Sequence, residues 1–306
     1  MPERVDWSII VHGGARPIPV EDRAAFEDGC RRAVLAGREI LAGGGPAVSA
    51  VEAAIRVLED DPTFNAGTGA VRNAEGDVEC DAAVMDGATL DVGAVGAAPG
   101  LLNPVAAAVL VLREQPILLV GEAARRFALE RGAEPVRDPQ ATAENSDSDT
   151  DTPAPGATDD PTSAGCDTVG CVALDTAGHL AAGTSTGGLE GAAAGRVGDS
   201  PLPGCGLYAD DGAGAVALSG TGEEIARVTL ASRVLAALPG RSPEEAARTA
   251  LRALDRVGGN AGVIAIDPAG RTGWAHTSPQ FAVAWADSAT EVTARTQQAS
   301  AAGGEA

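Results

Sequence analysis

Hydrophobic and polar positions recur along this chain with two periods, one of about 3.6 residues and one of about two, which predicts a mixture of helices and strands. The helical period covers residues 20–41, 47–59, 104–113, 122–131, 222–237 and 243–257. Short apolar runs predict strands at residues 7–12, 71–74, 78–85, 88–97, 117–120, 169–174, 179–184, 212–218, 261–266, 272–276 and 281–285. The polar residues from 288 onward are expected to fray.

One stretch interrupts this pattern. Residues 138–164 contain no Val, Ile, Leu or aromatic residue and no positive charge. Such a segment cannot bury enough apolar surface to offset the entropy lost on ordering. It could be a linker between two domains, or an exposed leader that ends at a processing site. Because both flanking halves read as one α/β unit, we favour a single domain over residues 1–306 with a processing site.

The composition is that of a folded and strongly acidic protein. The 306 residues are 44% hydrophobic, the formal net charge is −21, and all 22 basic residues are arginine. Without a basic stripe, nucleic-acid binding is not expected. A GC-rich genome would explain the arginine but not the excess of Asp and Glu. We therefore predict a halophilic protein, adapted to concentrated salt in which charge repulsion is screened over short distances.

Cysteine and histidine show no metal-binding pattern. The five cysteines are scattered without a CxxC pair and the three histidines lack ligand spacing, so neither a disulfide framework nor a zinc site is expected. The first residues are polar and charged, unlike a signal peptide, and no apolar run reaches about 18 residues. We expect a cytoplasmic protein with no membrane partner and no cofactor.

Candidate chemistry begins at Thr168, where the acidic stretch meets the apolar run 169–174. Taken alone, a threonine there is an ordinary residue at the start of a strand. Clusters of small residues follow at 184–188, 195–201 and 219–223. Their spacings match neither a GxxxxGK[ST] phosphate loop, nor a GxGxxG dinucleotide loop, nor a GxSxG nucleophile elbow. Nucleotide binding and a serine-hydrolase triad are therefore not expected.

Taken together, these segments resemble the plant-type asparaginase and isoaspartyl-peptidase family, which also contains the glycosylasparaginases. The motifs that carry the resemblance are His12-Gly-Gly-Ala15, Phe64-Asn-Ala-Gly67, Asp81-Ala-Ala-Val-Met-Asp-Gly87, Asp167-Thr-Val-Gly170, Thr184-Ser-Thr-Gly-Gly188, Gly195-Arg-Val-Gly-Asp-Ser-Pro201 and Gly220-Thr-Gly-Glu223. The resemblance covers residues 7–285 apart from the acidic stretch. The resemblance implies an N-terminal-nucleophile hydrolase with an α+β fold, a four-layer αββα sandwich.

The chemistry of threonine agrees with this resemblance. A threonine hydroxyl is a poor nucleophile unless a base lies beside it. Cleavage of the Asp167–Thr168 bond would give Thr168 an α-amine with a pKa of about 7.7–8.0, next to its own hydroxyl. We therefore hypothesise self-cleavage, in which the Thr168 hydroxyl attacks the Asp167 carbonyl and water hydrolyses the ester. The products would be an α subunit, 1–167, and a β subunit, 168–306.

The resemblance also implies roles for the residues around Thr168. Thr186 would hydrogen-bond the nucleophile, and Asn65 would be a polar group behind it. The Ser219 hydroxyl and the Gly220 N–H would form the oxyanion hole. Relatives commonly carry Thr where this chain has Ser219, which keeps the hydroxyl but restricts its rotamer less.

For substrate binding, the resemblance implies that Arg196 pairs with an α-carboxylate through two parallel hydrogen bonds. Asp199 would bind the α-ammonium, helped by the Gly222 carbonyl, and Gly220 would also contact the substrate. By spacing alone, Arg196 and Asp199 could equally form a surface ion pair. Relatives hold a sodium ion on backbone carbonyls, which here would be those of Leu58, Glu59, Asp61, Phe64, Ala66 and Thr68.

The resulting prediction is a self-processing amidohydrolase that cleaves L-asparagine and β-aspartyl (isoaspartyl) dipeptides through a β-aspartyl ester on Thr168. Family members imply a dimer of processed αβ pairs. Two alternatives stay open. Asp167 resembles the residue that precedes the nucleophile in glycosylasparaginases, whereas Gly187-Gly188 resembles the asparaginases. An unprocessed chain could instead be an inactive protein that binds aspartyl ligands.

Overall fold

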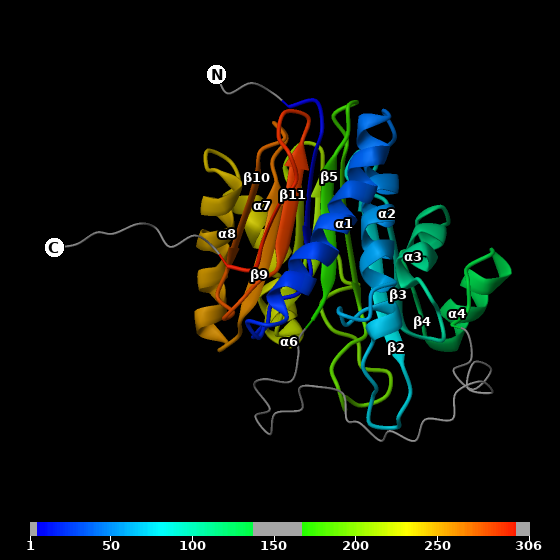
Figure 1. Cartoon of the computed structure of the whole chain (residues 1–306). Coiled ribbons are helices and arrows are strands. Elements are labelled where there is room, and N and C mark those ends of the chain that lie inside the picture. Colours follow the sequence, from blue (N-terminus) through cyan, green and yellow to red (C-terminus); the bar gives the residue numbers. More distant parts are fainter. Residues whose placement is uncertain (1–4, 137–166, 298–306) are drawn as a thin grey trace.

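The structure, a computed structural model, describes residues 5–136 and 167–297, and its strands form two sheets (Figure 1). In this part of the chain the larger sheet has the order β12-β11-β1-β5-β6-β2-β3-β4, and the smaller has the order β10-β9-β8-β7. Neighbouring strands are antiparallel except β3 and β4. The strands of the larger sheet are β1 (Ser8–His12), β2 (Glu79–Asp86), β3 (Val92–Pro99), β4 (Leu118–Val120), β5 (Val169–Leu174), β6 (Leu180–Thr186), β11 (Val283–Asp287) and β12 (Thr293–Arg295). Those of the smaller sheet are β7 (Leu207–Asp210), β8 (Gly214–Gly220), β9 (Ala261–Ile266) and β10 (Thr272–His276).

Helices pack on the outer faces of both sheets. Figure 1 shows α1 and α2 side by side over the larger sheet, with α8 at the other side of the molecule. The helices on the larger sheet are α1 (Arg23–Ala42), α2 (Ala47–Glu59), α3 (Pro104–Leu112) and α4 (Gly121–Glu130). Those on the smaller sheet are α6 (Gly222–Val228), α7 (Leu230–Ala237) and α8 (Pro243–Leu251). Short 3₁₀ turns cover Gly67–Gly69 and Arg252–Arg256.

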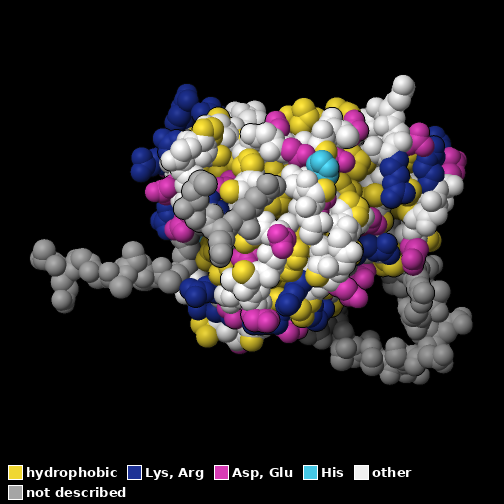
Figure 2. All heavy atoms as spheres, turned by 90° about the horizontal axis from the view of Figure 1, so that it is seen from above, with side chains coloured by type: hydrophobic (Ala, Val, Ile, Leu, Met, Phe, Trp, Pro, Cys, Tyr) yellow, Lys and Arg dark blue, Asp and Glu magenta, His cyan; other side chains and the backbone are white. Residues whose placement is uncertain are grey.

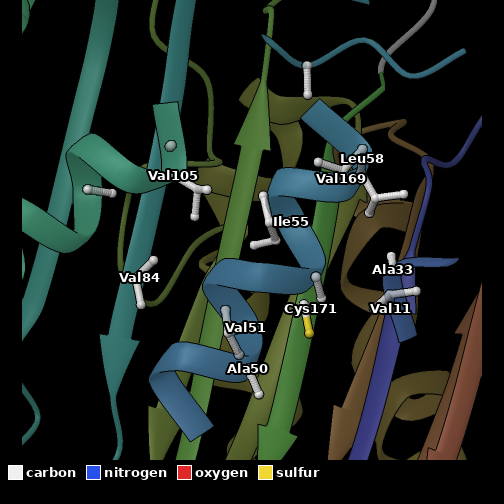
Figure 3. Close-up of a cluster of buried hydrophobic side chains, with 14 of the residues drawn as sticks. Val11, Ala33, Ala50, Val51, Ile55, Leu58, Val84, Val105, Val169 and Cys171 are labelled. Carbon is white, nitrogen blue, oxygen red and sulfur yellow. The ribbon is translucent and has the colours of Figure 1, made fainter. Parts of the chain in front are cut away.

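The core consists of three apolar clusters: one between the larger sheet and its helices, one between the two sheets, and one between the smaller sheet and its helices. Val51 and Ile55 of α2 pack over Val169 and Cys171 of β5 in the first cluster (Figure 3). The predicted mixture of helices and strands is confirmed.

Strand β5 is apolar along its whole length because both of its faces are covered. Val169, Cys171 and Ala173 face the helices of the first cluster, whereas Val172 and Leu174 face the second sheet. This alternation fixes the register in which β5 leaves Thr168 at the end of the strand.

Two predicted elements differ in the structure because the local backbone conformation overrides the apolar pattern. Residues 71–74 form no strand, since the Asn73 side chain accepts hydrogen bonds from the backbone of Glu75 and Asp77 and makes a turn. The predicted helix 222–237 is two helices, α6 and α7. Thr229 separates them with a left-handed φ of 49°.

Pairing across the sheets accounts for two other differences. The segment predicted to fray contains β12, whose residue Thr293 pairs with Trp285 of β11. Strand β7 was not predicted, because its four residues are too short for a clear period, and it is held by its pairing with β8. The acidic stretch 138–164 lies outside the described residues, so its role as a leader before the processing site stays a prediction.

Candidate active site

The predicted catalytic residues meet at one edge of the two sheets. Thr168 directly precedes β5, and β5 runs antiparallel to β6, with Val169 opposite Ser185. The start of β5 therefore lies beside the end of β6, where Thr186 is the last residue. The end of β8 supplies Ser219, whose Oγ lies 3.2 Å from the Thr168 backbone nitrogen.

The Asp167–Thr168 peptide bond is buried and held by three hydroxyl groups. The Asp167 carbonyl accepts a hydrogen bond of 2.8 Å from Thr186 Oγ1, and the Thr168 N–H donates to Ser219 Oγ. Thr168 Oγ1 lies 2.9 Å from Ser200 Oγ. Asp167 is 1% exposed and Thr168 is 6% exposed. The bond, its carbonyl and the neighbouring hydroxyl are therefore fixed relative to one another.

Two of these contacts differ from what the sequence predicted. In the uncleaved chain the Thr186 hydroxyl donates to the Asp167 carbonyl and accepts from the Gly188 N–H at 3.1 Å, rather than bonding the Thr168 hydroxyl. The hydroxyl that contacts the Thr168 hydroxyl belongs to Ser200, a residue of the 195–201 motif to which the sequence gave no role. The position of Ser200 in this motif was the one feature of the sequence that could have indicated its role at the site.

Ser219 and Gly220 end β8 beside Thr168, and their role as an oxyanion hole stays a prediction. Ser219 Oγ accepts a second hydrogen bond of 3.1 Å, from the Ala15 N–H, which joins the His12–Ala15 motif to the site. A Cβ atom on Gly220 would lie 2.2 Å from the Asn260 carbonyl oxygen. Only glycine fits there, so the backbone of β8 can approach β9 closely at the site.

Asn65 supports the loop that follows Thr186. Its Nδ2 donates to the Gly188 carbonyl at 2.8 Å, and its Oδ1 accepts from the Val71 N–H at 3.0 Å. The Gly187 N–H donates to the Asn65 carbonyl at 2.9 Å. Asn65 therefore lies behind the reaction centre and holds Thr186 through this loop.

Arg196 is paired with a residue that the sequence did not single out. Its Nε and Nη2 donate to the two carboxylate oxygens of Glu223 at 2.9 and 2.8 Å. The spacing had also allowed a surface ion pair between Arg196 and Asp199. In the structure Arg196 instead makes this bidentate contact with Glu223. One edge of the guanidinium is thus taken by Glu223, while its Nη1 lies against the backbone of Gly198.

Asp199 is a buried carboxylate beside this arginine. It is 3% exposed, and among the described residues its Oδ2 has no hydrogen-bond partner. Burial raises its pKa to about 7, although the charge of Arg196 opposes this shift. A Cβ atom on Gly222 would lie 2.8 Å from Asp199 Oδ1, so glycine is needed where α6 begins. A cationic ligand would satisfy the unpaired oxygen.

Asp81 anchors the loop that carries Arg196 and Asp199. Its Oδ1 accepts from the Ala97 N–H at 2.7 Å and its Oδ2 accepts from the Gly198 N–H at 3.4 Å. Burial raises its pKa to about 6. The sequence motif that begins at Asp81 was noted, but only the fold reveals that it supports this loop.

Asp167 and Arg16 form an ion pair next to Thr168. Arg16 Nη1 lies 2.9 Å from Asp167 Oδ2, without the geometry of a hydrogen bond. Burial raises the Asp167 pKa to about 6, and the charge of Arg16 opposes this shift. The pair therefore keeps a buried carboxylate beside the predicted cleavage bond.

His12 does not provide a base at this centre. Its ring is fully buried and packs on Phe281, with 5.3 Å between the ring centroids. Burial lowers its pKa to about 3, so the imidazole is neutral near pH 7. Neither ring nitrogen has a side-chain acid beside it among the described residues.

The cavity in front of Thr168 is narrow in the uncleaved chain. It encloses about 10 Å³ and is lined in part by Asp167, Thr168, Arg196 and Asp199. That volume holds at most about one water molecule. This space is therefore too small for an amino acid in the uncleaved chain.

Of the predicted sodium ligands, Leu58 and Glu59 are the last residues of α2, and the others lie in the loop between α2 and β2. A Cβ atom on Gly69 would lie 2.2 Å from the Phe64 carbonyl and 2.7 Å from that of Pro62, while the Ala66 carbonyl accepts from the Gly69 N–H. A carbonyl oxygen that accepts one hydrogen bond keeps a second lone pair for a cation, and the sodium ion itself stays a prediction. Across residues 5–136 and 167–297, no group of three or more His, Cys, Asp or Glu side chains could hold a metal.

Comparison with known proteins identifies the family. The model of the family described as "Asparaginase" matches residues 5–294. The chain is 42% identical over 272 residues to the isoaspartyl peptidase/L-asparaginase of Xenopus laevis, an alignment that covers 86% of each protein. The chain belongs to the asparaginase family. The resemblance predicted from its motifs is thereby confirmed.

Other members of the asparaginase family are similar over the same extent. The human isoaspartyl peptidase/L-asparaginase is 40% identical, with 90% of this chain and 92% of the human protein aligned. The isoaspartyl peptidase of Salmonella typhimurium is 39% identical, with 90% and 94% aligned. These names support the predicted hydrolysis of asparagine and isoaspartyl peptides. In the described ranges, none of the helices has the length and apolar character needed to cross a bilayer.

Proposed function

We propose that this chain is a self-processing amidohydrolase that cleaves L-asparagine and β-aspartyl dipeptides with Thr168 as nucleophile. The observation that carries the proposal is the buried Asp167–Thr168 bond, which has a hydroxyl donor on its carbonyl and another hydroxyl 2.9 Å from Thr168 Oγ1. Membership of the asparaginase family supports the class of reaction.

The first step is self-cleavage. Thr168 Oγ1 attacks the Asp167 carbonyl carbon, and the negative charge that develops on the carbonyl oxygen is stabilised by the Thr186 hydroxyl. The C–N bond breaks as the Thr168 nitrogen takes up the proton that Thr168 Oγ1 loses, which leaves Asp167 as an ester on Thr168. Water then hydrolyses the ester. The broken C–N bond leaves a free α-amine on Thr168, and hydrolysis of the ester restores its hydroxyl and opens the narrow cavity to substrate.

Turnover repeats this chemistry on the substrate. The α-amine accepts the proton of Thr168 Oγ1 as the oxygen attacks the side-chain carbonyl of asparagine or of a β-aspartyl dipeptide. The oxyanion is stabilised by the Ser219 hydroxyl and the Gly220 N–H. The amine then returns the proton to the leaving nitrogen, and water hydrolyses the β-aspartyl ester to aspartate.

Recognition of the aspartyl group depends on the pair of charged residues beside the nucleophile. Arg196 binds the α-carboxylate with the part of the guanidinium that Glu223 leaves open. Asp199 binds the α-ammonium, which satisfies its unpaired Oδ2 and lowers its pKa from about 7, helped by the Gly222 carbonyl.

The proposal includes the architecture and the assembly. The two sheets with helices outside them would form the αββα sandwich of an N-terminal-nucleophile hydrolase. Residues 1–167 and 168–306 would remain together as one processed pair, and two pairs would form a dimer in the cytoplasm of a halophile. A sodium ion on the carbonyls of the 58–68 loop would hold Asn65 in place.

The test is the Thr168→Ala variant beside the wild type. N-terminal sequencing of the wild type should give a chain that starts Thr-Val-Gly-Cys. The variant should stay near 30 kDa, and asparagine hydrolysis should fall by at least about 10³-fold, since the nucleophile is lost. Thr176→Ala, at an exposed turn, is the matched control and should behave like wild type. Unchanged hydrolysis by Thr168→Ala would overturn the proposal.

Glycosylasparaginase activity is a second candidate, favoured by one observation. Asp167, which resembles the residue before the nucleophile in those enzymes, is buried and paired with Arg16 at the cleavage bond. Comparing kcat/KM for N-glycosylated asparagine and for β-aspartyl dipeptides separates the two. A higher value for the glycosylated substrate would establish this alternative.

A further inference from the structure

Arg16 is a charged residue next to the reaction centre to which the proposed function gives no role in turnover. It follows the motif that ends at Ala15, and the Ala15 N–H donates to Ser219 Oγ at 3.1 Å. The same oxygen accepts from the Thr168 N–H at 3.2 Å. One hydroxyl therefore joins the backbone before Arg16 to the nitrogen that becomes the catalytic amine.

The guanidinium of Arg16 is only partly satisfied by its neighbours. Its ion-pair partner among the described residues is Asp167, at 2.9 Å. Its Nε is buried without a hydrogen-bond partner there, and its charged carbon lies 5.2 Å from the centre of the Phe26 ring. The side chain is 30% exposed. Arg16 thus has donors left for a further acceptor.

Self-cleavage removes the covalent link that keeps Asp167 beside Arg16. Arginine cannot lose its charge in a protein, and a half-buried charge without a partner is unfavourable. After cleavage the site therefore favours a new carboxylate in the space that Asp167 occupied.

The leaving group of a dipeptide enters the same space. Its nitrogen must come within about 3 Å of the Thr168 amine, because that amine returns the proton. In the precursor, the atoms next to the Thr168 nitrogen are those of Asp167, whose carboxyl carbon is four bonds away, about 5 Å along the chain. The α-carboxyl carbon of a leaving amino acid is two bonds from the leaving nitrogen, which itself lies about 3 Å from the Thr168 amine. This carboxyl carbon can therefore also lie about 5 Å from the Thr168 nitrogen.

We propose that Arg16 binds the α-carboxylate of the amino acid released from a β-aspartyl dipeptide, and so determines the preference for dipeptides with a free C-terminus. The inference rests on the proposed function. Asparagine releases ammonia, which carries no carboxylate, so Arg16 distinguishes between the two kinds of substrate.

The experiment compares β-aspartyl-leucine with β-aspartyl-leucinamide, which lacks only the terminal charge. The ratio of kcat/KM for the acid to that for the amide should fall about tenfold or more in Arg16→Ala, and less in Arg16→Lys. Rates are divided by the concentration of Thr168 N-termini, because Arg16 also contacts Asp167 in the precursor. Arg38→Ala, an α1 residue paired with Glu291, is the control and should keep the wild-type ratio.

The wild type alone provides a second measurement if Arg16→Ala does not mature. It should have a KM for the acid about tenfold below that for the amide. Equal values, or an equal loss for both substrates in the variant, would overturn the inference and leave the proposed function intact. Absence of hydrolysis of asparagine and of both dipeptides would instead overturn the proposed function itself.

Discussion

Three hydroxyl groups surround Thr168, and each contacts a different atom. Thr186 is bonded to the carbonyl of the residue before the nucleophile, Ser200 to its side chain and Ser219 to its backbone nitrogen. A hydroxyl can both donate and accept, so each group can follow the change from amide to ester to amine. This versatility would let one site support both of the proposed reactions, self-cleavage and turnover.

The orientation of the Arg196 side chain depends on its pairing with Glu223, which leads to a prediction. Glu223 fixes the guanidinium through two hydrogen bonds. In Glu223→Gln one oxygen becomes a donor, so the arginine loses its fixed orientation. We expect KM for asparagine to rise about tenfold with a smaller change in kcat.

Steady-state kinetics with the neighbouring Glu224→Gln variant as control would test this. Glu224 contacts Arg227 rather than Arg196, so its variant should have the wild-type KM. If Glu223→Gln has an unchanged KM, the orientation of Arg196 does not depend on Glu223.

At the scale of elements, one buried carboxylate joins three of them. Glu59, the last residue of α2, accepts hydrogen bonds at the same oxygen from the Val105 N–H of α3 at 2.8 Å and from the Ser185 hydroxyl of β6 at 2.7 Å. Asn103, which precedes α3, instead donates to Asp60. The start of α3 and the strand that carries Thr186 are therefore held by a residue distant in sequence.

This carboxyl group makes stability depend on pH. Burial raises the Glu59 pKa from 4.5 to about 8, so between these values the folded chain binds a proton that the unfolded chain lacks. The free energy of unfolding therefore falls as pH rises, by about 1.4 kcal/mol per pH unit from this group. Glu59→Gln removes this contribution. Relative to the variant, the wild type should lose about 2 kcal/mol between pH 6 and pH 8.

Urea unfolding would measure this difference, with every protein also carrying Thr168→Ala so that the chain stays intact. Asp81, Asp167 and Asp199 also have raised pKa values, but they are present in both proteins and cancel in the comparison. Glu39→Gln, on the exposed side of α1, should keep the wild-type slope. Parallel stability curves for Glu59→Gln and wild type would contradict the assignment.

At the scale of the whole molecule, the site exists because strand ends from both sheets meet at one edge. The same scale governs the response to salt, because charge repulsion acts over the whole surface. Figure 2 shows arginine and acidic side chains interspersed on one face rather than separated by sign. The formal charge of −21 opposes folding through repulsion among many acidic side chains.

Salt should stabilise the protein by screening this repulsion. Raising KCl from about 0.1 M to about 1 M shortens the Debye length from about 10 Å to about 3 Å. We expect the melting temperature to rise by several degrees, measured by circular dichroism on the Thr168→Ala chain. Sucrose at equal osmolality is the control for water activity. A melting temperature that falls or stays level in KCl would argue against adaptation to salt.

Much of this protein could be determined from its sequence alone. The apolar periods predicted α2 over residues 47–59 and the hairpin of β9 and β10, because each depends on neighbours in the chain. The motifs identified the family and predicted that Thr168, Ser219 and Arg196 belong to one site. These features are local, since a motif records which residue types a site needs.

Only the tertiary structure decided how those residues are connected. The contacts of Ser200 with Thr168, of Glu223 with Arg196 and of Arg16 with Asp167 join residues separated by 27 to 151 positions. No periodicity encodes such pairs, because the distance between two side chains depends on sheet order and strand register. The sequence by itself determined which groups are present, whereas packing decided which atoms meet.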